Sequence, residues 1–244
     1  MNIPHPLPAL YWMWRQRSLQ IHAWKNLLND LPLAGTRLAI VGNAGYLAEE
    51  NQGDEIDGHD LVLRMNNFKI RGFEAQVGTR VDIYMSNFYV PDINFENPDI
   101  QRARWIVSSR PNTFKKHKAD KLDLRYGEHL TEGVHRVGAS TVYAPSLEYT
   151  RKVAVELQDC PTTGMMAILL ATDLLLEKCA SIHLTGFSFF EGPHHYFQDG
   201  QTTAFRHHNI PTEKTILAAR LAPYRKEGRA SCDSTVAHLL GLEG

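Results

Sequence analysis

Arg37-Leu38-Ala39-Ile40-Val41-Gly42-Asn43-Ala44-Gly45 is the stretch that decides the fold class. A mostly apolar run passes directly into a small, glycine-bounded turn, a pattern typical of a buried strand that ends at a ligand-binding edge. Small residues there let a phosphate approach the main chain, and Asn43 adds amide donors. By itself, the segment is equally compatible with an ordinary strand-to-helix turn.

This turn does not match the common nucleotide motifs. Gly42 and Gly45 are three residues apart and Tyr46-Leu47 follows, so the G-x-G-x-x-G pattern of dinucleotide-binding folds is absent. The lysine of a P-loop is absent as well. The segment therefore argues against a nicotinamide cofactor.

Short apolar runs alternate with helical patterns along the rest of the chain, which predicts a mostly parallel, Rossmann-like sheet flanked by helices in one α/β domain. The predicted strands are 37–41, 60–65, 81–85, 105–108, 141–144 and 181–184. The predicted helices are 16–29, 147–158, 162–178 and 211–225. We expect a single catalytic domain over 37–244, preceded by an N-terminal helical segment over 1–36.

Composition restricts the partners and the compartment. A net charge of -1 over 244 residues gives no overall attraction to nucleic acid, so no nucleic-acid partner is expected. The three cysteines, Cys160, Cys179 and Cys232, are typical of reduced thiols in a cytoplasmic protein. No signal peptide or membrane span is evident in the sequence.

The N-terminal segment carries clustered tryptophans and basic residues. Trp12, Trp14 and Trp24 alternate with residues such as Arg15 and Lys25 on the predicted helix. The helix either packs on the domain or lies on a membrane surface, where aromatic and basic side chains suit the headgroup layer. The second alternative would place the protein at the inner membrane face.

Residues 111–138 are polar and charged, and we expect a surface excursion between two strands. It is either a solvated loop or an acceptor or lid region, because long insertions beside parallel strands often line substrate sites.

Two further segments extend the candidate site. Pro161-Thr162-Thr163-Gly164 begins a long apolar helix, whose free N–H groups would attract an anion, although a threonine there could act only as the N-cap. Asn66 ends the predicted strand 60–65 and could meet the same phosphate as Asn43. Arg64, in that strand, either pairs internally with Glu55, Asp57 or Asp60 or contacts the ligand, and the structural ion pair is at least as well supported as the ligand contact.

Metal ligands are not evident. The chain has no D-x-D motif, and its histidines and cysteines are not spaced as a zinc site. We therefore expect no metal and no other cofactor, so that hydrogen bonds, helix termini or protonated side chains must neutralise a departing phosphate.

The order of the segments resembles the sialyltransferase family, glycosyltransferase family 29. The large motif resembles Leu38 to Gly45, Glu55 to Asn66 and Gly72 to Gly78, and the small motif resembles Pro161 to Met166 followed by Cys179 to Phe187. Two short histidine motifs resemble His195-Tyr196-Phe197-Gln198 and His208-Asn209-Ile210-Pro211-Thr212-Glu213. The resemblance covers about residues 37–220, and it implies a GT-A-like sialyltransferase variant of the Rossmann-like fold.

One departure concerns a disulfide. The family's secretory members pair a cysteine at the start of the large motif with one in the small motif, whereas Leu38 occupies the first of these positions here and Cys179 the second. The chain also shows no signal anchor or stem, so it resembles a bacterial cytoplasmic relative.

The resemblance implies inverting, metal-independent transfer of sialic acid from CMP-sialic acid to a glycan or glycolipid hydroxyl. It makes His208 the general base, with His207 as a competitor, while His195 would contact the donor phosphate and Glu213 would orient His208 or begin the next helix. The implied donor-binding residues are Asn43, Ala44, Asn66, Thr162, Thr163, Gly164, Gly186, Phe187 and Tyr196.

Two alternatives stay open. A CMP-Kdo-dependent Kdo transferase of the same fold would use the same motifs. A non-catalytic, nucleotide-binding Rossmann-like protein would need the glycine turn but neither His195, His208 nor Glu213.

Overall fold

A parallel sheet forms the centre of the molecule. The computed structural model describes residues 19–89, 93–113, 118–119, 122–123, 127–193, 195–197 and 208–243. The order across the sheet is β1-β8-β5-β4-β3-β2-β9-β10, with every neighbouring pair parallel. The strands are β1 (Gln20–Ala23), β2 (Arg37–Val41), β3 (Leu61–Met65), β4 (Ile83–Ser86), β5 (Trp105–Ser108), β8 (Thr141–Ala144), β9 (Ser181–Thr185) and β10 (Ala230–Cys232). The six predicted strands are all present.

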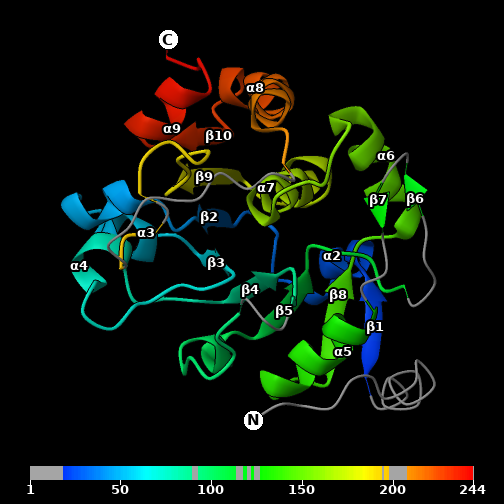
Figure 1. Cartoon of the computed structure of the whole chain (residues 1–244). Coiled ribbons are helices and arrows are strands. Elements are labelled where there is room, and N and C mark those ends of the chain that lie inside the picture. The colour runs from blue at the N-terminus through cyan, green and yellow to red at the C-terminus, as the bar shows by residue number, and fades with distance from the viewer. Residues whose placement is uncertain are drawn as a thin grey trace.

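Helices cover both faces of this sheet (Figure 1). The α-helices are α2 (Leu27–Asp30), α3 (Gly53–Asp57), α4 (Glu74–Val77), α5 (Gly127–Arg136), α6 (Leu147–Leu157), α7 (Thr163–Asp173), α8 (Ile210–Lys226) and α9 (Ser234–Leu239). Short 3-10 helices are η2 (Trp24–Asn26), η3 (Gly45–Glu49), η4 (Ile100–Arg102) and η5 (Leu175–Glu177), and β6 (Lys118–Ala119) pairs antiparallel with β7 (Leu122–Asp123). The prediction of a parallel sheet flanked by helices is confirmed.

The side chains of β2 alternate between the two faces of the sheet, and helices cover both faces. Leu38 and Ile40 belong to the larger core, to which α7 contributes Met165–Ala171, whereas Ala39 and Val41 pack with Ile56 of α3 on the other face. Successive strand residues face opposite sides, so a strand that is apolar at every position must be covered twice. The buried helix α7, apolar all round, is the main cover on one side.

The predicted helix 16–29 is wrong over Gln20–Ala23. These residues form β1, which pairs with β8 from Gln20 opposite Thr141 to Ala23 opposite Ala144. Trp24 follows in η2, where its side chain is buried and its indole N–H donates to the Ser108 carbonyl at 3.0 Å. Trp24 is therefore a core residue and is not available to a membrane surface, while Trp12 and Trp14 lie outside the described residues.

The predicted surface excursion 111–138 is wrong at its C-terminal end. Residues 127–136 form α5, whose Leu130 and Val134 are buried in the second hydrophobic cluster. Gly133 lies so close to Phe88 that an added Cβ would stand 2.6 Å from the ring. The helix therefore packs on the sheet, and residues 114–117, 120–121 and 124–126 lie outside the described part.

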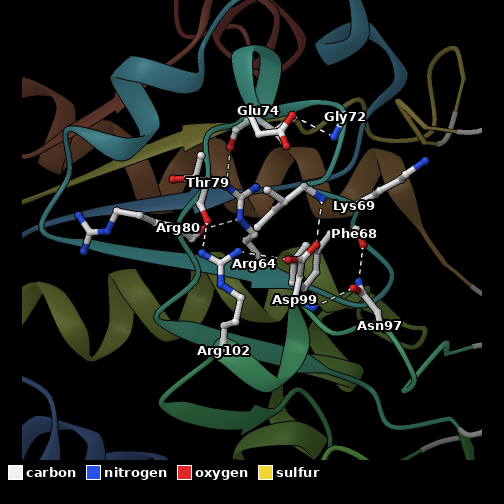
Figure 2. A network of polar contacts seen from close by, with 12 residues as sticks. Arg64, Phe68, Lys69, Gly72, Glu74, Thr79, Arg80, Asn97, Asp99 and Arg102 are labelled. Carbon is white, nitrogen blue, oxygen red and sulfur yellow. Dashed lines mark hydrogen bonds and ion pairs between the residues drawn. The ribbon is translucent and has the colours of Figure 1, made fainter.

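Arg64 of β3 is almost completely buried, but not against the predicted acids. Its Nε donates to the Arg80 carbonyl at 2.7 Å, Nη2 donates to the Val77 carbonyl, and the guanidinium lies over the Phe68 ring (Figure 2). Burial lowers the pKa of Arg64 to about 10. The predicted ion pair is therefore replaced by backbone carbonyls, which fix the loop between β3 and β4.

Candidate active site

A cavity of about 350 Å³ lies at the carboxyl edge of the sheet. Its walls come from the ends of β2, β3, β4, β5 and β9, from the start of α7 and from the segments before and within α8. The lining residues are Gly42, Asn43, Ala44, Met65, Asn66, Asn67, Asn87, Ile93, Arg110, Pro161, Thr162, Thr163, Gly164, Met165, Gly186, Phe187, Ser188, Phe189, Phe190, His195, His208, Ile210 and Glu213. This is the edge at which parallel α/β sheets bind ligands.

All the predicted site residues except Tyr196 line this cavity. The glycine turn after β2, Asn66 after β3, the Thr162-Thr163-Gly164 segment and the two histidines come together although they are far apart in the sequence. His207 lies outside the described residues, so its relation to His208 is not part of this geometry.

The floor of the cavity depends on a close approach of two glycines. A Cβ added at Gly42 would stand 2.1 Å from the Gly186 carbonyl oxygen, and one at Gly186 would meet Leu47 at 2.7 Å. Gly186 also has a φ of 79°, in the left-handed region that favours glycine. The Ala44 N–H donates to the Gly186 carbonyl at 3.0 Å, which joins the ends of β2 and β9.

Two amides stand beside this floor. Asn43 donates through Nδ2 to the Met65 carbonyl at 2.9 Å, and its buried Oδ1 has no hydrogen-bond partner among the described residues. Asn66 adopts a φ of 47° and accepts from the Asn87 N–H at 3.4 Å. Both amides are therefore oriented by main-chain groups of the neighbouring strand ends.

The start of α7 is held by a carboxylate. Thr162 is the N-cap, accepting from the Met165 N–H at 3.0 Å, and it donates to Glu213 from its backbone N at 2.7 Å and from its hydroxyl at 2.8 Å. The Thr163 hydroxyl lies 3.4 Å from that of Ser109 after β5. Thr162 thus fulfils the capping role expected of this segment while also lining the cavity.

Glu213 is buried in the first turn of α8. Burial raises the pKa of its carboxyl to about 7, although the two hydrogen bonds from Thr162 oppose this shift. A carboxyl with a raised pKa inside a cavity is typical of functional sites, and structural ion-pair networks also shift pKa values.

His208 is oriented by the main chain. Its Nδ1 lies 2.7 Å from the Cys160 carbonyl oxygen, and its ring stacks on Phe190 with centroids 6.2 Å apart. A carbonyl oxygen only accepts, so Nδ1 carries the proton in this bond, and in the neutral imidazole Nε2 then carries the lone pair. The ring is thus fixed in the tautomer that a base acting through Nε2 requires.

His195 lies in the cavity wall with its ring 4.9 Å from that of Phe197. The next residue, Tyr196, is buried outside the lining. Its hydroxyl donates to the Lys69 carbonyl at 2.5 Å and accepts from the Lys69 N–H at 2.9 Å, while its own N–H donates to the Asn43 carbonyl at 3.1 Å. Tyr196 therefore connects its own segment to the loop at Lys69 and to the turn at Asn43. Its hydroxyl bonds to Lys69, so this geometry does not supply the phosphate contact expected of Tyr196.

Several lining residues were not predicted. Asn87 and Arg110 follow β4 and β5 at the edge where Asn43 and Asn66 follow β2 and β3. The same rule that strand ends converge would have found them. Phe189 and Phe190, with φ values of 48° and 63°, give no such signal in the sequence.

In the part of the chain that the structure describes, no three His, Cys, Asp or Glu side chains gather as a metal site would require. Within the same part, no helix has the length and apolar character needed to cross a bilayer. Cys160, Cys179 and Cys232 carry thiols that are not joined in disulfides.

A parallel sheet with a cavity formed by strand ends and a helix N-terminus is an α/β architecture typical of nucleotide-binding domains. The model of Glycosyltransferase family 29 (sialyltransferase) matches residues 25–222, and the chain belongs to this family. The family resemblance in the motifs is thereby confirmed.

Individual relatives agree. The chain is 28% identical to type 2 lactosamine alpha-2,3-sialyltransferase of Mus musculus, covering 74% of this chain and 61% of the relative. It is 27% identical to CMP-N-acetylneuraminate-beta-galactosamide-alpha-2,3-sialyltransferase 1 of the same species, covering 74% and 54%. The chain thus spans about three fifths or less of the length of these relatives.

The fold is shared with a solved structure. A mammalian sialyltransferase superposes with a TM-score of 0.53 over 95% of this chain and 80% of that one, at 18% identity. The GT-A-like sialyltransferase variant expected for the sheet is therefore confirmed.

Proposed function

We propose that this chain is an inverting, metal-independent glycosyltransferase that moves sialic acid from CMP-sialic acid to a hydroxyl of a glycan. The observation that carries the proposal is the bond from His208 Nδ1 to the Cys160 carbonyl, because it leaves Nε2 as the proton acceptor in a cavity lined by the family's donor motifs.

The reaction uses these groups as follows. The acceptor oxygen attacks the anomeric carbon, its proton passes to His208 Nε2, and the bond to the phosphate breaks with its electron pair leaving on CMP. A neutral imidazole suits this transfer near pH 7. One displacement of this kind inverts the anomeric configuration.

Other lining residues of the cavity would hold the nucleotide. Asn43, Asn66, Ala44 and the Thr163-Gly164 main chain surround the space next to the Gly42–Gly186 floor. Amide and main-chain donors bind a phosphate without a metal ion, and a protonated His195 would neutralise charge on the leaving group. Phe187 then closes the side of the pocket beside Gly164.

The acceptor and the compartment extend the proposal. The relatives are named for lactosamine and galactosamide acceptors, so these are the first acceptors to test. We place the protein in the cytoplasm, and a further hypothesis is membrane contact through Trp12 and Trp14, which fractionation in the absence of detergent would test.

The deciding assay offers CMP-sialic acid and CMP-Kdo separately, with a lactosamine acceptor, in excess chelator. The proposal requires transfer from CMP-sialic acid, a product of inverted anomeric configuration by NMR, and no loss of rate with chelator. Transfer from CMP-Kdo alone would identify a Kdo transferase instead. Binding of CMP without any turnover of either donor would leave a non-catalytic nucleotide-binding protein.

A further inference from the structure

Asp233, at the N-cap of α9, uses its two carboxylate oxygens for different purposes. Oδ1 accepts from the Val236 N–H at 2.7 Å and so caps the helix. Oδ2 accepts from the Tyr46 hydroxyl at 2.6 Å. Asp233 lies beyond residues 25–222, to which the family model extends, so the second contact ties a segment outside that match to the centre of the site.

Tyr46 stands directly after the glycine turn that follows β2. Its hydroxyl oxygen accepts from the Gly186 N–H at 2.7 Å, and the same N–H lies 3.2 Å from Asp233 Oδ2. The three groups form a closed triangle of hydrogen bonds. We call Tyr46 and Asp233 together the Tyr46–Asp233 clamp.

The group held by this clamp is part of the cavity floor. Gly186 lines the cavity, accepts from the Ala44 N–H and approaches Gly42 too closely for any side chain at either position. The clamped N–H belongs to the Thr185–Gly186 peptide, whose carbonyl accepts from the Gly42 N–H at 2.8 Å, so a small rotation of this peptide would displace the turn before Tyr46. The contact between these two glycines leaves no slack to absorb such a movement.

The Tyr46 hydroxyl stays protonated and so can donate to Asp233. Tyr46 is largely enclosed, and burial together with the Asp233 charge raises the pKa of its hydroxyl well above the ordinary value. The phenol thus keeps its proton at any pH in which the protein would be assayed. A hydrogen bond to a carboxylate is also stronger than one between neutral groups.

We infer that Tyr46 and Asp233 are positioning residues, which hold the Gly186 peptide so that the cavity floor fits the nucleotide. The inference rests on the proposed function for the identity of the ligand. It assigns to the segment of β10 and α9 a part in donor binding, although none of its residues lines the cavity.

The test uses Tyr46→Phe and Asp233→Asn, with Tyr149→Phe as the matched control. Tyr149 donates to Asp173 at 2.9 Å, another tyrosine–aspartate bond, but lies outside the cavity lining. Asp233→Asn keeps an oxygen that can cap α9 but removes the charged oxygen that accepts from the Tyr46 hydroxyl. Two quantities are measured for each protein: the affinity for CMP by calorimetry and amide hydrogen exchange of the segment 185–188.

We expect Tyr46→Phe and Asp233→Asn each to weaken CMP binding roughly fivefold, the usual effect of one lost hydrogen bond, and to accelerate exchange in 185–188. The double variant should be little weaker than either single one, because both remove the same contact. Tyr149→Phe should lower thermal stability to a similar extent while changing neither quantity.

If Tyr46→Phe leaves amide hydrogen exchange at 185–188 unchanged, Tyr46 does not hold Gly186 and the inference is wrong, whatever the affinity for CMP. Exchange and affinity changes of equal size in Tyr149→Phe would overturn it too, since the effect would then be general destabilisation. Failure of the wild type to bind CMP would contradict the proposed function instead, and the exchange measurement would still decide whether Tyr46 holds Gly186.

Discussion

Glu213, in the first turn of α8, accepts two hydrogen bonds from Thr162, the N-cap of α7, at 2.7 Å and 2.8 Å. The contact joins the last histidine motif to the small motif, 51 residues apart in the chain. Glu213 therefore does more than begin a helix, because its carboxylate fixes the end of the buried helix that faces the cavity.

The first prediction concerns stability as a function of pH. The folded-state pKa of Glu213, about 7, exceeds its ordinary value of 4.5, so the unfolded chain ionises first as pH rises. The free energy of unfolding therefore falls as pH rises from 4.5 to about 7, and above pH 7 this loss of stability amounts to about 3 kcal/mol. Denaturant unfolding of wild type and Glu213→Gln should show the variant gaining relative stability over this range. A difference that does not change with pH would contradict the raised pKa.

The second prediction concerns Tyr196. Tyr196→Phe removes both hydrogen bonds to the Lys69 main chain, so we expect a loss of roughly 1–2 kcal/mol of stability. Because the hydroxyl bonds to the Lys69 main chain and Tyr196 does not line the cavity, the KM for the CMP-sugar should stay within about twofold of the wild-type value, less than one lost hydrogen bond would cause. A large rise in KM at unchanged stability would instead support direct contact with the phosphate.

The third prediction concerns Arg110, whose cationic side chain is part of the cavity wall. Arg110→Gln should raise the KM for an anionic CMP-sugar roughly tenfold, and the effect should shrink in high salt, since part of it is electrostatic. Arg102→Gln, which removes a charge paired with Asp99 away from the cavity, serves as the control. Equal effects of the two substitutions on KM would show that Arg110 acts only through net charge.

The centre of the fold was predictable and its edges were not. The six predicted strands are mostly apolar runs that are largely buried, which local pattern alone identifies. The edge strands β1 and β10 contain only four and three residues. Gln20–Ala23 forms a strand because β8 offers it parallel partners, and such tertiary pairing overrides local preference.

The helix α5 was missed for another reason. Leu130, Val134 and Val137 do recur at helical spacing, and all three are buried, but the charged residues around them dominated the composition. Counting apolar positions at that spacing would have found the helix.

The site followed from chain order rather than from any single motif. The Val41–Gly45 turn was ambiguous alone, whereas its agreement with the small motif and the two histidine motifs gathered residues that the fold brings into one cavity. Arg64 shows the limit of such reasoning. A sequence does not reveal that the buried guanidinium of Arg64 donates to the carbonyls of Val77 and Arg80.

His208 is the residue on which the whole account depends. The most direct measurement compares sialic acid transfer from CMP-sialic acid by wild type, His208→Ala and His207→Ala, with CMP affinity measured in parallel. The account predicts that His208→Ala lowers kcat by roughly 10²-fold or more, as loss of a general base does, with CMP affinity kept, while His207→Ala stays near wild type. Near-wild-type kcat in His208→Ala with loss of transfer in His207→Ala would contradict it.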